Sequence, residues 1–176
     1  MRNTQAGMSM IEVLITIAIL VVGLLGLAGL QANVSKVEFE AYQRAQAIVL
    51  VQEIVDRLSA NKKNAAAYVV NDIGAGGTVQ SCAGLLGAAY DLCDLNNIIV
   101  GSAEKTAAGG PAVGGMLGAR ACVTSPIANY YVVTVVWQGM RKTVAPVEAC
   151  GAGQYGDEKL RRTVSFPVRV ATLTAP

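Results

Sequence analysis

The most prominent hydrophobic pattern is an apolar run close to the N-terminus. Val13–Leu30 comprises eighteen residues without a charge, and as a helix it measures roughly 27 Å, close to the hydrocarbon thickness of a bilayer. A cleaved secretory signal has a shorter apolar core followed by a small-x-small site, whereas this run continues into Gln31 and a helical pattern. Arg2 precedes it and favours a cytoplasmic N-terminus. The run therefore predicts a retained membrane helix.

A second apolar pattern predicts that the helix continues to Ala60. No Pro or Gly occurs between Gln31 and Ala60. Apolar residues recur there at intervals of seven, with further ones at the alternate three-four positions: Val34, Ala41, Ile48 and Val55, then Val37, Val51 and Leu58. Arg44 interrupts this stripe, so it is not a clean coiled-coil seam. We expect the stripe to pack on a sheet of the same chain, with one helix of about 80 Å from Met8 to Ala60.

Strand patterns come late in the chain. Tyr130–Trp137 is β-branched and aromatic, and Thr163–Thr172 alternates apolar and polar residues, with Pro167 marking it as an edge strand. Arg120–Thr124 is a candidate third strand, and Ser81–Leu95 is a candidate short helix in a region rich in Gly and Ala. The sequence thus predicts an α+β fold, in which the helix packs on a small antiparallel sheet of three or four strands.

Composition and charge argue against several classes of protein. The chain of 176 residues is 53% hydrophobic and 15% charged, which is too apolar for disorder. Its net charge of +2 argues against nucleic-acid binding. Histidine is absent, which removes the Ser-His and Cys-His pairs and the commonest metal ligand. We therefore predict no enzyme activity, no cofactor and no metal.

The sequence has no complete catalytic or phosphate-binding motif. Ser102–Lys105 matches the S-x-x-K of penicillin-recognising enzymes, but the accompanying S-D-N and K-T-G elements do not occur, and Lys142-Thr143 is followed by Val144. No Gly-rich phosphate-binding string is present either. The S-x-x-K match is therefore interpreted as a chance occurrence.

Glu12 stands one residue before the uncharged run, where a carboxylate either snorkels to the head groups or has a functional partner. The string Gly7-Met8-Ser9-Met10-Ile11-Glu12, followed by VLITIAIL, resembles the processing site of type IV prepilins and of type II secretion pseudopilins. The resemblance implies that prepilin peptidase cuts between Gly7 and Met8 and that Met8 becomes the N-methylated terminus. It also implies that Glu12 pairs with the terminal amine of a neighbouring subunit in the fibre.

Two details qualify the resemblance. Met8 stands where the family usually has Phe, and the proline common in the helix of major pilins is missing near Gly29. Instead Gly23, Gly26 and Gly29 recur every third residue. They favour either local bending or melting of the helix, or a close-packing face between membrane helices. The stretch GLLGLAGLQ and the segment Cys150–Asp157 are similar to the type IV pilus modification proteins, the PilV-type minor pilins.

The four cysteines indicate an exported, oxidised domain. They are Cys82, Cys93, Cys122 and Cys150. Four cysteines allow three pairings, of which we favour the sequential one, Cys82–Cys93 and Cys122–Cys150. A zinc site is the alternative, but no pair has C-x2-4-C spacing and there is no His. The mixed-charge run Asp157–Arg162 is interpreted mainly as a solvated turn, and alternatively as a docking surface for a neighbouring subunit.

Together these features predict three segments: a leader peptide (1–7), a transmembrane or fibre-core helix (8–31) and a periplasmic head (32–176). The leading hypothesis is a minor pilin that is anchored in the inner membrane and then drawn into a surface pilus, where it affects adhesion or twitching motility. Its partners would be prepilin peptidase, other major and minor pilins, and the pilus assembly machinery. The alternatives are a type II secretion pseudopilin and, more remotely, a membrane-anchored periplasmic enzyme or binding module.

Overall fold

The computed structural model describes residues 9–107, 110 and 112–171. The chain divides into two compact units, Met1–Phe39 and Glu40–Pro176. The long helix α1 (Met10–Ala60) supplies the described secondary structure of the first unit and enters the second. Because the second unit contains the sheet, we call it the head.

The first unit exposes its apolar side chains. From Met10 to Leu30 every residue of α1 is exposed, including Leu14 at 64% and Leu25 at 69%. Among the described residues, α1 is the helix long and apolar enough to cross a membrane. A water-soluble protein rarely leaves so large an apolar surface uncovered.

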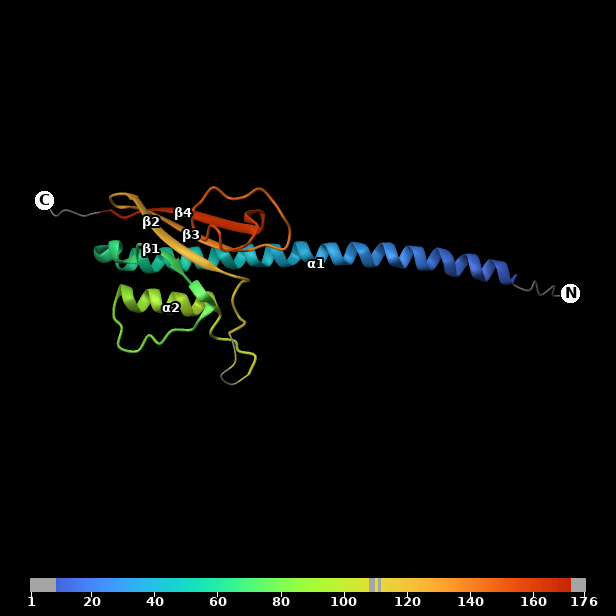
Figure 1. Ribbon diagram of the computed structural model, residues 1–176, viewed down its shortest axis with the longest axis horizontal. Coiled ribbons are helices and arrows are strands. Elements are labelled where there is room, and N and C mark those ends of the chain that lie inside the picture. The colour runs from blue at the N-terminus through green and yellow to red at the C-terminus, as the bar shows by residue number, and fades with distance from the viewer. Residues whose placement is uncertain (1–8, 108–109, 111, 172–176) are drawn as a thin grey trace, which may run out of the picture. The chain divides into compact units, whose positions relative to one another are not determined.

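The head is α+β (Figure 1). A four-stranded sheet in the order β1-β2-β3-β4 has antiparallel pairing throughout. The elements after α1 are β1 (Val70–Ile73), α2 (Ala88–Val100), β2 (Arg120–Ile127), β3 (Tyr130–Gln138) and β4 (Arg161–Arg169). Short 3-10 helices span Lys62–Tyr68, Ala75–Gly77 and Glu158–Leu160.

The predicted elements are largely confirmed. α1 ends at Ala60, as the pattern predicts, and β4 is an edge strand that contains Pro167. The fourth strand, β1, was not predicted. The short helix lies further along the chain than expected, because Gly84 and Gly87 adopt positive φ and keep the preceding residues in turns. It ends at Gly101, whose φ of 76° and contact with the Gly114–Gly115 backbone leave no room for a side chain.

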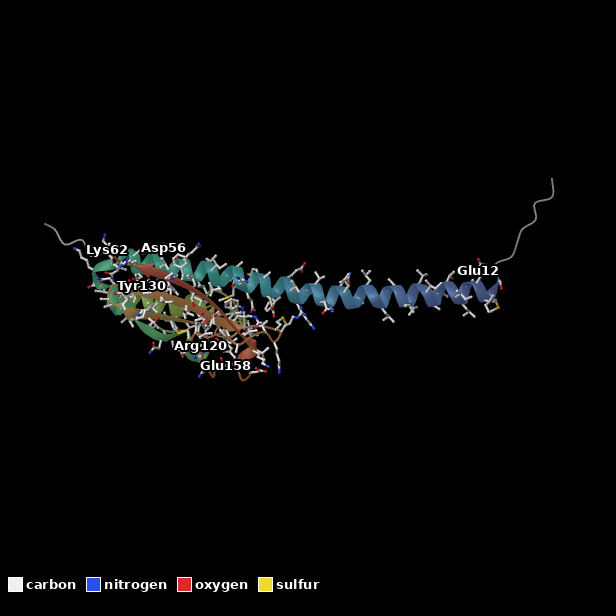
Figure 2. The ribbon with its side chains drawn as sticks, turned by 90° about the horizontal axis from the view of Figure 1, so that it is seen from above. Glu12, Asp56, Lys62, Arg120, Tyr130 and Glu158 are labelled. Carbon is white, nitrogen blue, oxygen red and sulfur yellow. A yellow bond between two sulfur atoms is a disulfide. The ribbon has the colours of Figure 1, made fainter. Side chains whose placement is uncertain are left out.

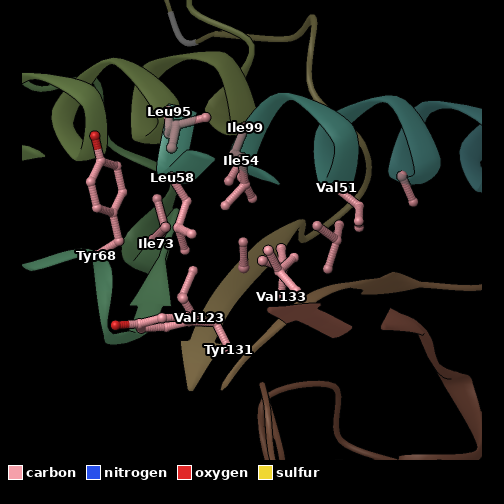
Figure 3. Close-up of a cluster of buried hydrophobic side chains, with 14 of the residues drawn as sticks. Val51, Ile54, Leu58, Tyr68, Ile73, Leu95, Ile99, Val123, Tyr131 and Val133 are labelled. Carbon is pink, nitrogen blue, oxygen red and sulfur yellow. The ribbon is translucent and has the colours of Figure 1, made fainter. Parts of the chain in front are cut away.

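The main core lies between the two helices and one face of the sheet (Figure 3). Ile54 and Leu58 project into it from α1, and Leu95 projects into it from α2. Alternate residues of β3 complete it from below; these are Tyr131, Val133, Val135 and Trp137. A sheet with one face on helices accounts for this strict alternation.

The predicted apolar stripe on α1 is confirmed at Val51 and Leu58, which are buried, and wrong at four other positions, which are exposed: Val34, Val37, Ala41 and Ile48. Val55 is half-buried. The buried positions are Gln43, Ala47, Val51, Ile54 and Leu58. A straight α-helix has 3.6 residues per turn, so a line of residues seven apart drifts by about 20° per heptad, whereas steps of four, four, three and four stay over the sheet.

The opposite face of the sheet carries a second, smaller core. Val136 packs there with Tyr155 and with the half-cystines Cys122 and Cys150. The hydroxyl of Tyr155 donates to the carbonyl of Gly118 at 2.7 Å, and burial raises the pKa of Tyr155 to about 12. The chain after β3 therefore covers this face rather than extending into solvent.

Candidate functional site

The predicted assembly segment lies at the start of α1. Gly7 and Met8, where cleavage is predicted, lie outside the described residues. Glu12 stands in the first helical turn (Figure 2), and its backbone N–H donates to the carbonyl of Ser9 at 3.0 Å. A carboxylate in the first turn interacts favourably with the helix dipole. Glu12 is exposed beside the apolar surface of α1, where a partner cation can reach it.

The helix remains continuous through its glycines. α1 passes Gly23, Gly26 and Gly29 without a break, and a Cβ added at any of the three would meet nothing within 4 Å. Their surface is therefore open to a neighbouring helix. Bending and close packing both remain predictions for this segment.

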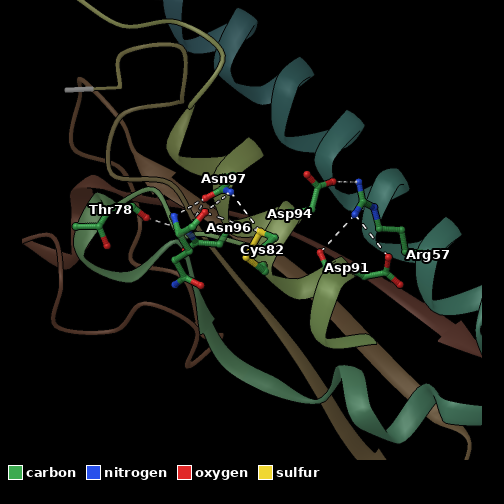
Figure 4. The surroundings of a disulfide bond; sticks show 9 residues. Arg57, Thr78, Cys82, Asp91, Asp94, Asn96 and Asn97 are labelled. Atoms are coloured by element: carbon green, nitrogen blue, oxygen red, sulfur yellow. Dashed lines mark hydrogen bonds and ion pairs between the residues drawn. A yellow bond between two sulfur atoms is a disulfide. The ribbon is translucent and has the colours of Figure 1, made fainter. Parts of the chain in front are cut away.

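The structure pairs Cys82 with Cys93, with Cα atoms 5.7 Å apart (Figure 4). This disulfide ties the loop before α2 to the helix itself. Asn97 reinforces it, because its side chain accepts from the N–H of Gln80 at 2.7 Å and donates to the same residue's carbonyl at 2.9 Å. Asn96, which is 4% exposed, likewise donates to the carbonyl of Thr78 at 2.9 Å.

An ion-pair cluster joins α1 to α2. Arg57 contacts Asp94 at 2.6 Å and Glu53 at 2.7 Å, and it lies 3.8 Å from Asp91 (Figure 4). The hydroxyl of Tyr68 also donates to Asp91, and burial together with this bond raises the pKa of Tyr68. The cluster holds α2 beside α1, and we assign it a structural role.

The second disulfide, Cys122–Cys150, joins β2 to the long connection between β3 and β4, with Cα atoms 5.9 Å apart. We call residues 139–160 the β3–β4 loop. The side chain of Arg161, 3% exposed, holds this loop from the start of β4. Its guanidinium donates to the carbonyls of Glu148 (2.6 Å), Cys150 (2.9 Å) and Pro146 (3.1 Å), and it pairs with Glu158 at 2.6 Å.

The neighbouring Arg162 holds the other part of the same loop. It donates to the hydroxyl of Thr143 at 2.8 Å and to the carbonyl of Arg141, and it lies 3.4 Å from a carboxylate oxygen of Glu40. The same Glu40 oxygen accepts from the N–H groups of Met140 and Arg141, both at 3.0 Å. The loop is therefore attached to α1 at the first residue of the head.

The charge run Asp157–Arg162 is not the solvated turn that we mainly expected. Asp157 accepts from the N–H of Lys159 and caps a 3-10 helix, and Arg161 is buried. A hydrogen bond from the N–H of Gly153 and the pairing with Arg161 lower the pKa of Glu158. We call the contacts of Arg161 with the β3–β4 loop the arginine clamp. The sequence does not reveal it, because charged residues before a strand usually lie on the surface.

The S-x-x-K match and the metal site, both considered from the sequence, are the remaining candidates. Ser102 belongs to the turn that closes α2, where its N–H donates to the carbonyl of Asn97 at 2.9 Å. Within residues 9–107, 110 and 112–171, no group of three or more Cys, Asp or Glu side chains is placed to hold a metal ion.

Comparison with known families gives one match. Residues 2–28 match the family model of the prokaryotic N-terminal methylation motif. Comparison with curated proteins and with solved structures found no match. The motif supports the resemblance to type IV pilin-like prepilins, and the head has the α+β architecture of a long helix on an antiparallel sheet that a pilin fold requires. The match is confined to the N-terminal segment and does not separate pilus subunits from pseudopilins.

Proposed function

We propose that this chain is a minor subunit of a type IV pilus, held in the inner membrane by α1 with its head in the periplasm and later incorporated into the fibre. The observation that carries the proposal is the methylation motif at residues 2–28, overlapping a helix whose apolar side chains are all exposed up to Leu30. Such a surface needs lipid, or the helices of other subunits, around it. Prepilin peptidase and other pilins are the partners that this function requires.

Glu12 is proposed to guide assembly. An unpaired carboxylate is costly inside a bundle of apolar helices, so a cation from a neighbour must accompany it. The methylated amine of Met8 on an adjacent subunit would neutralise Glu12 and fix the axial position of the incoming helix. Lipid covers the apolar side chains in either case, so the carboxylate matters for assembly rather than for insertion.

The head is proposed to act by binding surfaces rather than by chemistry. Its two disulfides suit an oxidising periplasm or cell surface. In the described residues, the polar contacts of Arg161 and Arg57 hold the loops and helices of the head together, and we assign no reaction to them. Effects on adhesion or twitching motility would follow from the subunit's presence in the fibre.

The first test is to shear surface fibres from cells and to search that fraction by mass spectrometry for the N-terminal peptide. A peptide beginning at N-methylated Met8 in the fibre fraction supports both processing and incorporation. The processed form confined to membranes would favour a pseudopilin instead. A chain that still begins at Met1 in a strain with active prepilin peptidase would contradict the proposal.

A second test isolates the carboxylate. Glu12→Gln is expected to leave membrane insertion unchanged and to lower the amount of the chain in sheared fibres at least tenfold. Glu38→Gln is the matched control, because Glu38 is an exposed glutamate on the same helix beyond the apolar run. Equal incorporation of both variants would remove Glu12 from the assembly mechanism.

A further inference from the structure

The two edges of the sheet in the head differ in how they are protected against pairing. The edge strand β1 has four residues, an irregular register with β2, and an ion pair between Asp72 and Arg120. The edge strand β4 has nine residues in continuous register with β3, and no charged residue lies between Arg162 and Arg169. Short strands, charges and irregularities are the usual protection of a sheet edge. The edge at β4 is therefore the one open to pairing.

Two hydrogen bonds at the ends of β4 show which of its backbone groups face away from the sheet. The N–H of Val170 donates to the carbonyl of Asn129 at 2.9 Å. The N–H of Gly139 donates to the carbonyl of Leu160 at 2.8 Å. Since backbone groups alternate in direction along an antiparallel strand, the even-numbered residues of β4 bond to β3 and the odd-numbered ones point outward. Among the described residues, no further strand lies on that side of β4.

Three of the odd-numbered residues define the pairing that this edge accepts. Thr163 and Ser165 each point an N–H and a C=O outward, whereas Pro167 has only a C=O to offer. Proline at an outward position costs β4 no bond to β3, so the strand tolerates it. Hydrogen-bond donors and acceptors in this alternating arrangement match the backbone of another extended segment.

An apolar groove lies beside the same edge, on the face of the sheet that holds α1. Phe166 pairs with Val133 of the core, so the side chains of Val164 and Phe166 point toward that face. Together with residues of α1, which include Ile48 and Val55, they line a groove of about 490 Å³. Phe166 is 52% exposed and Ile48 is 43% exposed. The helix and the edge strand thus leave apolar surface between them that the described part of the head does not cover.

The polar residues beside the groove do not fill it. Gln52 and Asp56 are the remaining residues of α1 that border it with Val51, and both are exposed. A strand added to the edge would lie about 4.8 Å from β4, with every second side chain on the face of Phe166. Apolar side chains at those positions would enter the groove, and the side chains between them would lie beside the hydroxyls of Thr163 and Ser165.

We infer that residues 163–167 of β4 are a docking edge for an extended segment of a partner protein, in which apolar residues opposite Val164 and Phe166 alternate with polar ones. The segment adds a fifth strand to the sheet through backbone hydrogen bonds to Thr163 and Ser165, and its apolar side chains fill the groove against α1. The inference goes beyond the proposed function, because it concerns the head alone and holds for a pilus subunit and a pseudopilin alike.

The missing donor at Pro167 disfavours a second copy of this chain as the occupant. Antiparallel pairing of β4 with itself about Ser165 sets Thr163 opposite Pro167 on both sides of the centre, and each of those pairs lacks one N–H. A partner segment without proline meets this defect once instead of twice.

The test measures binding of fluorescein-labelled peptides to the full chain in detergent micelles by fluorescence polarisation. The probe is the peptide KTVTVTK, whose valines are placed to enter the groove. The peptide KTSTSTK lacks the apolar side chains, and KTVTVTK with an N-methyl group on its central threonine lacks the N–H that would donate to Ser165. On the chain, Ser165→Pro removes one outward N–H, as Pro167 does naturally. Ser165→Ala is the matched control, because both variants lose the hydroxyl contact with Thr134 at 2.9 Å.

We expect saturable binding of KTVTVTK. N-methylation of the peptide and Ser165→Pro should each weaken binding at least tenfold, and KTSTSTK should bind at least fivefold more weakly, whereas Ser165→Ala should change the affinity less than twofold. No saturable binding of KTVTVTK, or equal binding of the N-methylated peptide, would overturn the inference, and neither result depends on how well a variant folds. Self-association of the unmodified chain that Ser165→Pro abolishes would assign the edge to a second copy and would overturn the proposed occupant.

Discussion

Replacing Arg161 with Met tests whether a buried arginine maintains the shape of the head. Met retains the apolar length of the side chain and removes the guanidinium. The change leaves three backbone carbonyls, those of Glu148, Cys150 and Pro146, without their donor. It also separates Glu158 from the cation that it contacts at 2.6 Å.

The expected loss of stability follows from burial. A hydrogen bond from a charged donor contributes about 1.5–3 kcal/mol, although such values do not add. Leaving a buried acceptor without its donor costs about 1–3 kcal/mol. Arg161 is 3% exposed and serves three carbonyls, whereas Glu158 is 35% exposed and stays partly solvated. We therefore expect Arg161→Met to cost about 3–5 kcal/mol, mostly from the three carbonyls. Arg161→Lys should recover only part of it, because an ammonium group lacks the planar fork that reaches several acceptors.

Urea denaturation of the full chain in detergent micelles measures this loss. Trp137 is the single tryptophan of the chain and is buried on β3, so its fluorescence reports unfolding of the head. With a urea slope of about 2 kcal/mol per molar, the midpoint should fall by about 2 M. Arg169→Met is the control: Arg169 is an exposed arginine on the same strand and should change stability by less than about 0.5 kcal/mol. A loss of stability below about 1 kcal/mol for Arg161→Met would refute the stabilising role of Arg161.

Three further predictions concern the same head. Replacing both cysteines of a disulfide with Ser should cost about 3.6 kcal/mol of stability for Cys122–Cys150, whose sequence separation is 28, and about 2.8 kcal/mol for Cys82–Cys93, whose separation is 11. The difference arises because opening the longer loop gives the unfolded chain more entropy. The urea midpoint of the Cys122–Cys150 variant should therefore be the lower of the two. Gln43→Leu should raise stability by about 1–3 kcal/mol, since among the described residues neither buried amide atom of Gln43 has a hydrogen-bond partner, and an unchanged or lower midpoint would contradict it. The pKa of Glu158 is lowered from 4.5, so its ionised carboxylate contributes to folding stability above that pH, and this contribution is lost as the pH falls. When the free energy of unfolding is measured against pH, it should fall less in acid for Glu158→Gln than for the unmodified chain.

The fold was accessible from sequence wherever local patterns decide structure. The end of α1 at Ala60 and the edge position of β4 were predicted, because a long stretch without Pro or Gly and a strand that contains Pro167 have local physical causes. β1 was missed, because Val70–Ile73 is short and becomes a strand only by pairing with β2. Ile48 was expected to be buried and is exposed, because the seven-residue repeat does not reveal which side of a helix the sheet will cover.

The assembly segment and the clamp differ in how far sequence reveals them. Glu12 is a candidate from sequence, because a carboxylate beside an apolar run is costly and because the string around it resembles a prepilin processing site; its role in assembly stays a prediction. Arg161 was not identified, because the acceptors of its guanidinium are backbone carbonyls 11 to 15 residues earlier in the chain. Backbone acceptors have no signature in the sequence, so only the path of the β3–β4 loop makes the role of Arg161 visible.

The two units make opposite demands on their surroundings. The head closes its own structure: its sheet is covered on both faces, two disulfides tie its loops, and Arg57 and Arg161 have their ionic partners within it. The N-terminal part of α1 has an exposed apolar surface from Met10 to Leu30. Under the proposed function, movement from membrane to fibre would exchange lipid for neighbouring helices around α1 and leave the core of the head unchanged. We therefore expect variants that weaken the head to lower the amount of folded subunit, and variants at Glu12 to act on assembly with the head intact.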